Sequence, residues 1–145
     1  MNCIFCKIIE KQSKAEILYE DEKVISFLDV NPLNYGHALV VPKVHCENFL
    51  DVPEEYLPDM FTAVQKVAAG IVKAVKPDGF NILSNNGRLA GQSVFHCHFH
   101  IIPRYTQDGH KFRMSFKKYN DNGMKEIAEK IKDCIITNEE INNNG

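Results

Sequence analysis

The stretch "SVFHCHFHIIPR", residues 93–104, places three histidines on alternate positions and separates them with apolar residues. The chain has 145 residues and only six histidines, so half of its histidines lie in this stretch. Because successive side chains of a β-strand point to opposite faces, the alternation predicts a strand with one buried, apolar face. The imidazoles of His96, His98 and His100 would then share the other face. Pro103 is expected to end the strand.

Three interpretations of this histidine face compete. A solvated surface strand would more typically carry Lys, Glu and Thr than three histidines in register. A metal site is the second interpretation, because neutral imidazole is a common zinc ligand. Nucleophilic catalysis is the third, because a neutral imidazole can attack phosphorus while its neighbours donate protons.

The residues before the strand favour chemistry on a phosphate. The segment "NNGRLAGQS", residues 85–93, offers amides, a hydroxyl and glycine backbone as hydrogen-bond donors, which suit phosphate oxygens. A zinc hydrolase would more plausibly have a carboxylate close to the histidines to act as a base. In the sequence the nearest acidic residues are Asp78 and Asp108.

Hydrophobic periodicity elsewhere predicts an α+β domain. One face of a long helix over 54–76 is marked by apolar residues spaced by three and four positions. These residues are Leu57, Phe61, Val64, Ala68, Ile71 and Val75. Short apolar runs bounded by turn residues predict strands. The predicted strands are 16–21, 23–30, 37–42 and 80–87, with helical segments at 3–9 and 123–136.

Composition narrows the functional classes. A net charge of −2 and a pI of about 6.3 do not fit a strongly basic nucleic-acid binder. No apolar run reaches the ~20 residues of a membrane span, and no signal peptide is recognisable at the N-terminus. An odd count of five cysteines favours reduced thiols and a cytoplasmic location. We expect a single domain over 1–136 and a polar, disordered tail over 137–145.

Cys3 and Cys6 form a Cys-x-x-Cys pair near the N-terminus. A redox pair is one interpretation, but no βαβ pattern follows it. Two unremarkable thiols are the second. Half of a zinc site is the third, and it would need two more nitrogen or sulfur ligands, for which His45 and His96 are candidates.

The segment "AGQSVFHCHFHIIPR", residues 90–104, closely resembles the signature of the histidine triad (HIT) family, in which three histidines alternate with apolar residues. The segments "CIFCKII" (3–9) and "FLDVNPLNYGHALVVPKVH" (27–45) match that family in order and spacing. The resemblance implies the HIT fold, a mostly antiparallel five-stranded sheet with one long helix, a short N-terminal helix and a C-terminal helix. It also implies a homodimer.

The same resemblance implies a nucleotidyl hydrolase that acts at the α-phosphorus of a purine nucleotide carrying an AMP or GMP moiety. Candidate substrates are adenosine phosphoramidates, dinucleoside polyphosphates and acyl-adenylates. His98 would be the nucleophile and form a covalent nucleotidyl-histidine, with His100 contacting the phosphate. Two alternatives stay open: a nucleotide-binding regulatory module with incidental hydrolysis, and a zinc-dependent hydrolase whose triad is the metal site.

Matching positions extend the implied site beyond the triad. Asp29 would hold the ribose hydroxyls between base-contacting walls formed by Phe27 and Val30, and His37 would lie at the edge of the pocket. The phosphate or leaving group would be contacted by Asn85, Gly91, Gln92 and Ser93. In the branch of the family with this cysteine pair, a structural zinc is held by positions matching Cys3, Cys6, His45 and His96.

Overall fold

The computed structural model describes residues 2–135. The chain divides into two compact units, residues 1–109 and 110–145, and each is described by itself. The expected tail over 137–145 lies outside the described residues. A single domain spanning 1–136 therefore stays a prediction.

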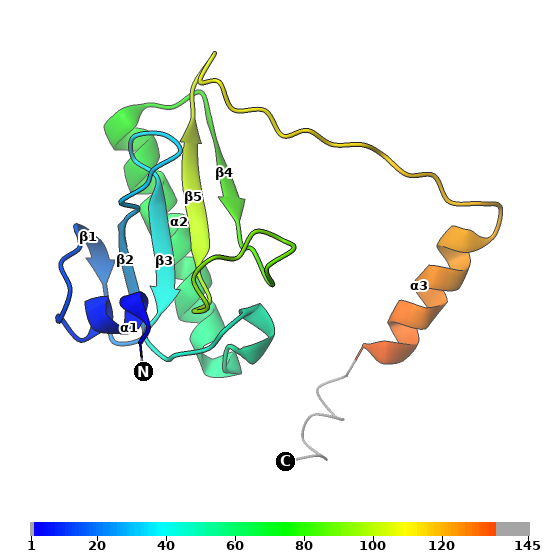
Figure 1. Cartoon of the computed structure of the whole chain (residues 1–145), viewed down its shortest axis with the longest axis horizontal. Helices are drawn as coiled ribbons and strands as arrows, with labels where there is room; N and C mark the ends of the chain where they lie inside the picture. Colours follow the sequence, from blue (N-terminus) through cyan, green and yellow to red (C-terminus); the bar gives the residue numbers. More distant parts are fainter. Residues whose placement is uncertain (1, 136–145) are drawn as a thin grey trace. The chain divides into compact units, whose positions relative to one another are not determined.

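The first unit is built on one five-stranded sheet (Figure 1). Its strands are β1 (Ile17–Glu20), β2 (Val24–Leu28), β3 (Ala38–Pro42), β4 (Gly79–Leu83) and β5 (Phe99–Arg104). They lie in the order β1-β2-β3-β5-β4, and every neighbouring pair is antiparallel. The α+β class and the five-stranded antiparallel sheet are thereby confirmed.

Residues 2–135 contain three α-helices: α1 (Ile4–Ile9) and α2 (Leu57–Val75) in the first unit and α3 (Gly123–Cys134) in the second. Two short 3₁₀ turns, Phe49–Asp51 and Glu54–Tyr56, precede α2. The helix predicted over 54–76 is therefore confirmed, but its first residues form the second 3₁₀ turn. Lys76 adopts a left-handed conformation with φ of 48° and ends α2.

The buried face of α2 is rotated slightly from the predicted one. Its buried residues are Met60, Ala63, Val64, Val67, Ala68 and Ile71. Phe61 and Val75, predicted for this face, are 50% and 38% exposed. The prediction was wrong for these two because they lie at the border of the face, where Phe61 still packs edge-on against Phe49 and Phe99.

The central strands β2 and β3 are buried on both faces, and their alternate residues enter two separate cores. Val24 and Val40 pack with α2 in the larger core. Ile25 and Val41 pack with α1 in the smaller core on the opposite face. In Figure 1, α2 runs behind the sheet and α1 lies in front of it. Continuous apolar runs in these strands are the expected pattern for double burial.

The histidine strand is shorter than predicted at its beginning and longer at its end. It starts at Phe99, so His96 and His98 lie in the irregular segment before it. The ladder is interrupted there because the Cys97 N–H bonds to the carbonyl of Cys46, beyond the end of β3. Pro103 does not end the strand, because β3 pairs with β5 only as far as Ile101 and needs no N–H from the proline.

The second unit contains α3, preceded by a segment at 110–120 without regular structure. The helix predicted at 123–136 is present and ends at Cys134. Within residues 2–135, no helix combines the length and the apolar character that crossing a membrane requires.

Gly36 occupies a backbone conformation that only glycine adopts easily. Its φ is +98°, and an added Cβ would lie 3.4 Å from Pro103 Cγ. Gly36→Ala should therefore lower the free energy of unfolding by roughly 1–2 kcal/mol. Gly70→Ala is the matched control, because Gly70 is helical with no neighbour within 4 Å of an added Cβ. It should raise stability by roughly 0.5–1 kcal/mol. Urea unfolding of both variants tests this, and equal effects would contradict it.

Candidate active site and metal centre

His96 is fully buried and belongs to a cluster of possible metal ligands. Its Nε2 lies 2.8 Å from the carbonyl oxygen of Pro42. A carbonyl only accepts, so Nε2 carries the proton and Nδ1 of the neutral ring is bare. That bare nitrogen lies 3.5 Å from Cys3 Sγ, 3.6 Å from Cys6 Sγ and 3.2 Å from His45 Nδ1.

The four ligand atoms of this cluster fit a tetrahedral zinc ion. They come from Cys3, Cys6, His45 and His96 and lie within 4.8 Å of one another. Zinc bonds of ~2.0–2.1 Å to nitrogen and ~2.3 Å to sulfur put the edges of a regular tetrahedron near ~3.4 Å for N···N and ~3.5 Å for N···S. The observed separations of 3.2–3.6 Å match these edges. The residues could therefore hold a metal, as the sequence predicted.

Ionisation of the cysteine pair would need a cation close by. Burial, together with the hydrogen bond and charge of Cys3, raises the pKa of the Cys6 thiol to about 11. Two thiolates side by side repel each other unless a cation lies between them. A divalent metal ion would supply that charge and would bind both sulfurs as thiolates.

His98 lies beside this cluster and presents a bare nitrogen of its own. Its Nδ1 lies 2.6 Å from the carbonyl oxygen of His96, so Nδ1 carries the proton and Nε2 keeps a lone pair. The ring of Phe5, from α1, meets the His98 ring edge-on at 5.1 Å between centroids. These two contacts fix both the tautomer and the plane of the imidazole.

His37 and His100 form a hydrogen-bonded pair. The backbone N–H of Leu33 donates to His37 Nδ1 at 3.0 Å, so the ring proton of neutral His37 is on Nε2. His37 Nε2 lies 2.9 Å from His100 Nδ1 and donates to it, which leaves the proton of His100 on Nε2. A carboxylate oxygen of Asp29 lies 3.6 Å from His37 Nε2. His100 thus offers an N–H donor where His98 offers a lone pair.

Burial keeps these imidazoles neutral. It is the main cause that lowers the pKa of His37, His96 and His98 below 6.5, and it lowers the pKa of His100 to about 4, helped by its neighbours His98 and His37. At neutral pH His98 therefore carries the lone pair that a nucleophile requires.

The base-contacting walls implied by the resemblance differ in burial. Phe27 is 3% exposed and packs edge-on against Phe5 at 5.4 Å between centroids, so it is part of the smaller core. Val30 is 84% exposed and is available to a ligand. Asp29 lies between them in sequence, and its Oδ1 accepts the N–H of Asn31 at 2.9 Å.

The loop before the histidines is held together by the side-chain amide of Gln92. Gln92 is 5% exposed and accepts the Gly87 N–H at 2.8 Å. Its Nε2 donates to the carbonyls of Glu47 and Val94. Within the structure this amide therefore holds the loop backbone in place. The contact of Gln92 with phosphate stays a prediction.

The other loop residues predicted to contact substrate are more accessible. Asn85 donates to the Gly91 carbonyl at 3.5 Å, and Gly91 has a φ of +97°. Ser93 is exposed. Their roles toward a substrate stay predictions.

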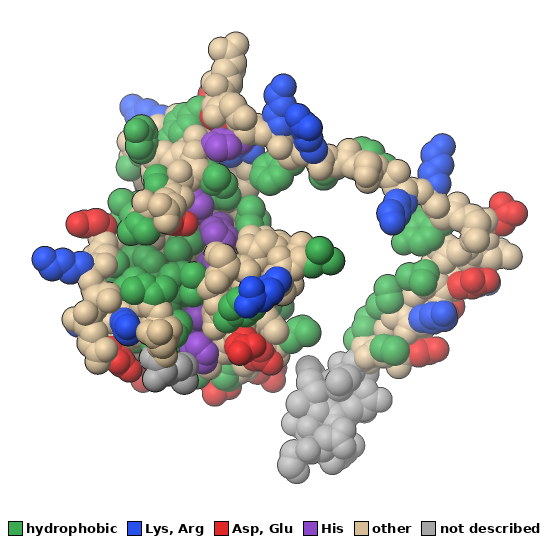
Figure 2. Space-filling model, in the orientation of Figure 1, with side chains coloured by type: hydrophobic (Ala, Val, Ile, Leu, Met, Phe, Trp, Pro, Cys, Tyr) green, Lys and Arg blue, Asp and Glu red, His purple; other side chains and the backbone are tan. Residues whose placement is uncertain are grey.

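Sequence reasoning missed three groups that shape the site. Phe5 touches the rings of both His96 and His98, and its place between the two cysteines was the available signal. The Pro42 carbonyl and the Leu33 N–H, which set two tautomers, are backbone groups and leave no mark in the sequence. On the face drawn in Figure 2, histidine atoms form a narrow band over the middle of the sheet unit.

Fold and site together define an α+β domain with a histidine-lined site beside a Cys/His metal-ligand cluster. The sequence profile of the HIT domain matches residues 10–107. The chain belongs to the HIT family. It is 48% identical to an uncharacterized HIT-like protein of Methanocaldococcus jannaschii over 90% of this chain and 98% of the other. A crystal structure of a HIT family member from Bacillus subtilis aligns with a TM-score of 0.87 and 42% identity, covering 94% of this chain and 99% of that one.

Two further similarities carry more specific names. The adenosine 5'-monophosphoramidase HNT1 of Saccharomyces cerevisiae is 43% identical over 70% of this chain and 62% of its own length. A Zn-bound histidine triad family protein from Mycobacterium smegmatis aligns with a TM-score of 0.70 and 32% identity, covering 93% of this chain and 99% of that one. The family and these relatives support a nucleotide hydrolase in general terms.

The lowered pKa of His100 predicts a loss of stability in acid. The unfolded chain protonates this residue near pH ~6.5, whereas the folded protein does so only near pH 4. Between these values the unfolded state binds more protons, so the free energy of unfolding falls as the pH falls. Urea unfolding between pH 7.5 and pH 4 should show wild type losing on the order of 2 kcal/mol more than His100→Gln. Equal losses in both proteins would contradict this.

Proposed function

We propose that the protein is a nucleotidyl hydrolase that cuts a bond at the α-phosphorus of a purine nucleotide through a covalent intermediate on His98. The observation that carries the proposal is the bare Nε2 of a neutral imidazole, fixed by the 2.6 Å hydrogen bond from its Nδ1 to the His96 carbonyl. An adjacent N–H donor on His100 complements it.

In the first step, Nε2 of His98 attacks the α-phosphorus as the bond to the leaving group breaks. The imidazole becomes positively charged, and its Nδ1–H remains bound to the His96 carbonyl, which stabilises that charge. The Nε2–H of His100 is suited to donate to a phosphate oxygen, where negative charge gathers. The leaving group departs with a proton taken up from solvent.

In the second step, water attacks the phosphorus of the nucleotidyl-histidine and releases a proton to solvent. The P–N bond breaks, its electron pair returns to His98 Nε2, and the nucleoside monophosphate leaves. Because the pKa values of His37 and His100 are lowered, both imidazoles are neutral in the resting enzyme. The starting tautomers are restored without any change in the backbone hydrogen bonds.

An adenosine phosphoramidate is the substrate class that we favour among the three candidates. Its support is the resemblance to a relative named adenosine 5'-monophosphoramidase. Asp29 would hold the ribose hydroxyls, and Phe27 and Val30 would contact the base. Asn85, Gly91, Gln92 and Ser93 would surround the phosphate.

A zinc ion with a structural role is part of the proposal. Its ligands would be Cys3, Cys6, His45 and His96. By binding all four, it would link the N-terminal segment and α1 to the segment before β5. The support is the tetrahedral spacing of the four ligand atoms and the similarity to a Zn-bound family member.

The alternative in which the triad itself is the metal site has less support. Among residues 2–135, the triad histidines fall into different groups of possible ligands, His96 with the cysteines and His100 with His37 and Asp29, while His98 is in neither. The other alternative is a nucleotide-binding regulatory module with incidental hydrolysis. Activity measurements decide between this alternative and the proposed hydrolase. The homodimer and the cytoplasmic location stay predictions.

Removal of the proposed nucleophile gives the sharpest test of the function. His98→Ala should lower kcat for hydrolysis of adenosine 5'-phosphoramidate by at least about a thousandfold. His110→Ala is the control, because His110 is the one histidine that belongs neither to the proposed active site nor to the metal-ligand cluster, and it should retain activity within about twofold. Full activity in His98→Ala would contradict the proposal. An AMP adduct on His98, detected by mass spectrometry in a His100→Ala variant, would further support it.

Loss of one proposed ligand should remove zinc. Cys6→Ser should lower the zinc content from about one ion per chain to a small fraction, because the serine hydroxyl is a poor ligand. The thermal midpoint should fall by roughly 5–10 °C, since bound metal stabilises the folded state. Elemental analysis and thermal unfolding test this, with Cys134→Ser as the control because Cys134 is exposed. Unchanged zinc in Cys6→Ser would contradict the assignment.

A further inference from the structure

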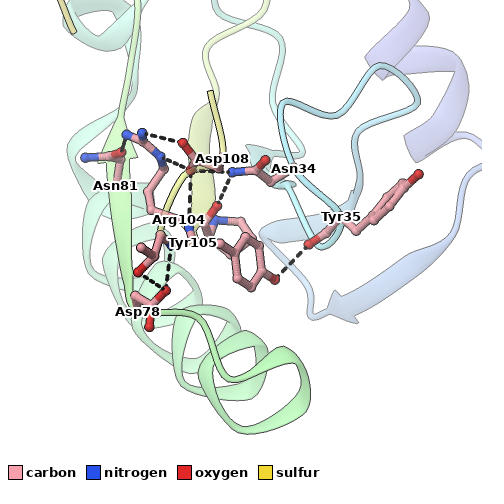
Figure 3. Close-up of polar contacts among 9 residues, drawn as sticks. Asn34, Tyr35, Asp78, Asn81, Arg104, Tyr105 and Asp108 are labelled. Carbon is pink, nitrogen blue, oxygen red and sulfur yellow. Dashed lines mark hydrogen bonds and ion pairs between the residues drawn. The ribbon is translucent and has the colours of Figure 1, made fainter. Parts of the chain in front are cut away.

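Arg104, at the end of β5, is the centre of a polar network that joins three segments of the first unit (Figure 3). Its Nε and Nη2 donate to the two carboxylate oxygens of Asp108 at 2.7 and 3.1 Å. Its Nη1 donates to Asn81 Oδ1 of β4 at 3.0 Å. The side chain of Asp108 is only 6% exposed, so this two-pronged ion pair is shielded from water.

Asn34 connects the same network to the loop between β2 and β3. Its Nδ2 donates to Asp108 Oδ2 at 3.0 Å and to the carbonyl oxygen of Pro103 at 2.8 Å. A second, weaker link runs from the hydroxyl of Tyr105 to the carbonyl of Tyr35 at 3.3 Å. Figure 3 shows these side chains converging from the loop and from the end of β5.

The loop is closed by its own backbone bonds, because the His37 N–H donates to the Asn34 carbonyl at 3.0 Å and the Asp29 N–H donates to the His37 carbonyl at 2.9 Å. Its large apolar side chains, Leu33 and Tyr35, are 50% and 88% exposed, so they add little hydrophobic burial to hold it. The side-chain bonds of Asn34 tie this closed loop to Asp108 and to the end of β5. Because Asp108 is buried and charged, the bond from Asn34 to its carboxylate is stronger than a surface hydrogen bond.

The position of this loop backbone controls the histidine pair. The N–H of Leu33, next to Asn34, donates to His37 Nδ1 and so keeps the proton of His37 on Nε2. That proton is donated to His100 Nδ1, which leaves the His100 proton on Nε2. A displaced Leu33 N–H would free His37 to take the other tautomer, and the donor on His100 would no longer be fixed.

We propose that Asn34 and Asp108 are positioning residues that fix the tautomers of His37 and His100 through the loop backbone. The proposal rests on the proposed function for its catalytic consequence, but the tautomers can be measured without activity. Neither residue is assigned to contact the substrate.

Two variants and one matched control test the proposal. Asn34→Ala removes both side-chain hydrogen bonds of Asn34, and Asp108→Asn removes the charge of the carboxylate that accepts one of them. Asp78→Asn is the control, because Asp78 also accepts hydrogen bonds in the turn after β5, but from the N–H and hydroxyl of Thr106 and not from the loop between β2 and β3. Thermal unfolding shows whether each variant folds.

Two readouts separate positioning from general stability. The first is the ¹⁵N chemical shifts of the ring nitrogens of His37 and His100 at neutral pH, which report the tautomer. The second is kcat and KM for adenosine 5'-phosphoramidate. Asn34→Ala and Asp108→Asn should give mixed tautomers and lower kcat about tenfold with KM within about twofold. Asp78→Asn should keep wild-type tautomers and kcat.

The outcomes are distinct from those that test the function. If wild type does not hydrolyse the substrate, the proposed function fails, and the nitrogen shifts still decide the positioning role. Wild-type tautomers in a folded Asn34→Ala variant would overturn the inference, even if its kcat falls. An equal change in Asp78→Asn would also overturn it. If Asp108→Asn does not fold, Asn34→Ala alone carries the test.

Discussion

The hydrogen bond between His98 Nδ1 and the His96 carbonyl is the interaction on which the rest of the site depends. It is short, at 2.6 Å, and it fixes the lone pair of His98 on Nε2. His96 itself is held by the Pro42 carbonyl through its side chain and lies among the ligand atoms of Cys3, Cys6 and His45. One residue therefore joins the metal-ligand cluster to the proposed nucleophile, through its side chain on one side and its backbone on the other.

This arrangement needs a rigid segment, although residues 96–98 are not part of the ladder. Packing supplies the rigidity instead. Cys97 is 1% exposed and packs with Ile101 in the core below α2, while Phe5 closes over the histidine rings from the opposite face. The apolar spacers thus hold the segment from one side and the short α1 helix holds it from the other. A shift of either layer would move the lone pair of His98.

From the sequence, the buried and exposed faces of the histidine segment were predicted more accurately than the start and end of its strand. Alternation placed Cys97 and Ile101 in the core correctly, because side-chain alternation continues through an extended segment even where the ladder stops. It could not show that the strand begins at Phe99, because that depends on a backbone bond to Cys46, far away in the sequence. The cysteine pair and its histidine partners were proposed from the family resemblance, and the structure brings all four together.

Tautomers are the part of the site that residue types cannot predict. A sequence does not show which ring nitrogen of a histidine carries the proton, because that depends on the group that each nitrogen contacts in the fold. Here a carbonyl meets His98, a backbone N–H meets His37, and His37 in turn meets His100. Burial lowers the pKa of all three rings, so each carries a single proton whose place these contacts decide. The result is a lone pair and an N–H donor on neighbouring side chains, set by two backbone groups and one histidine side chain.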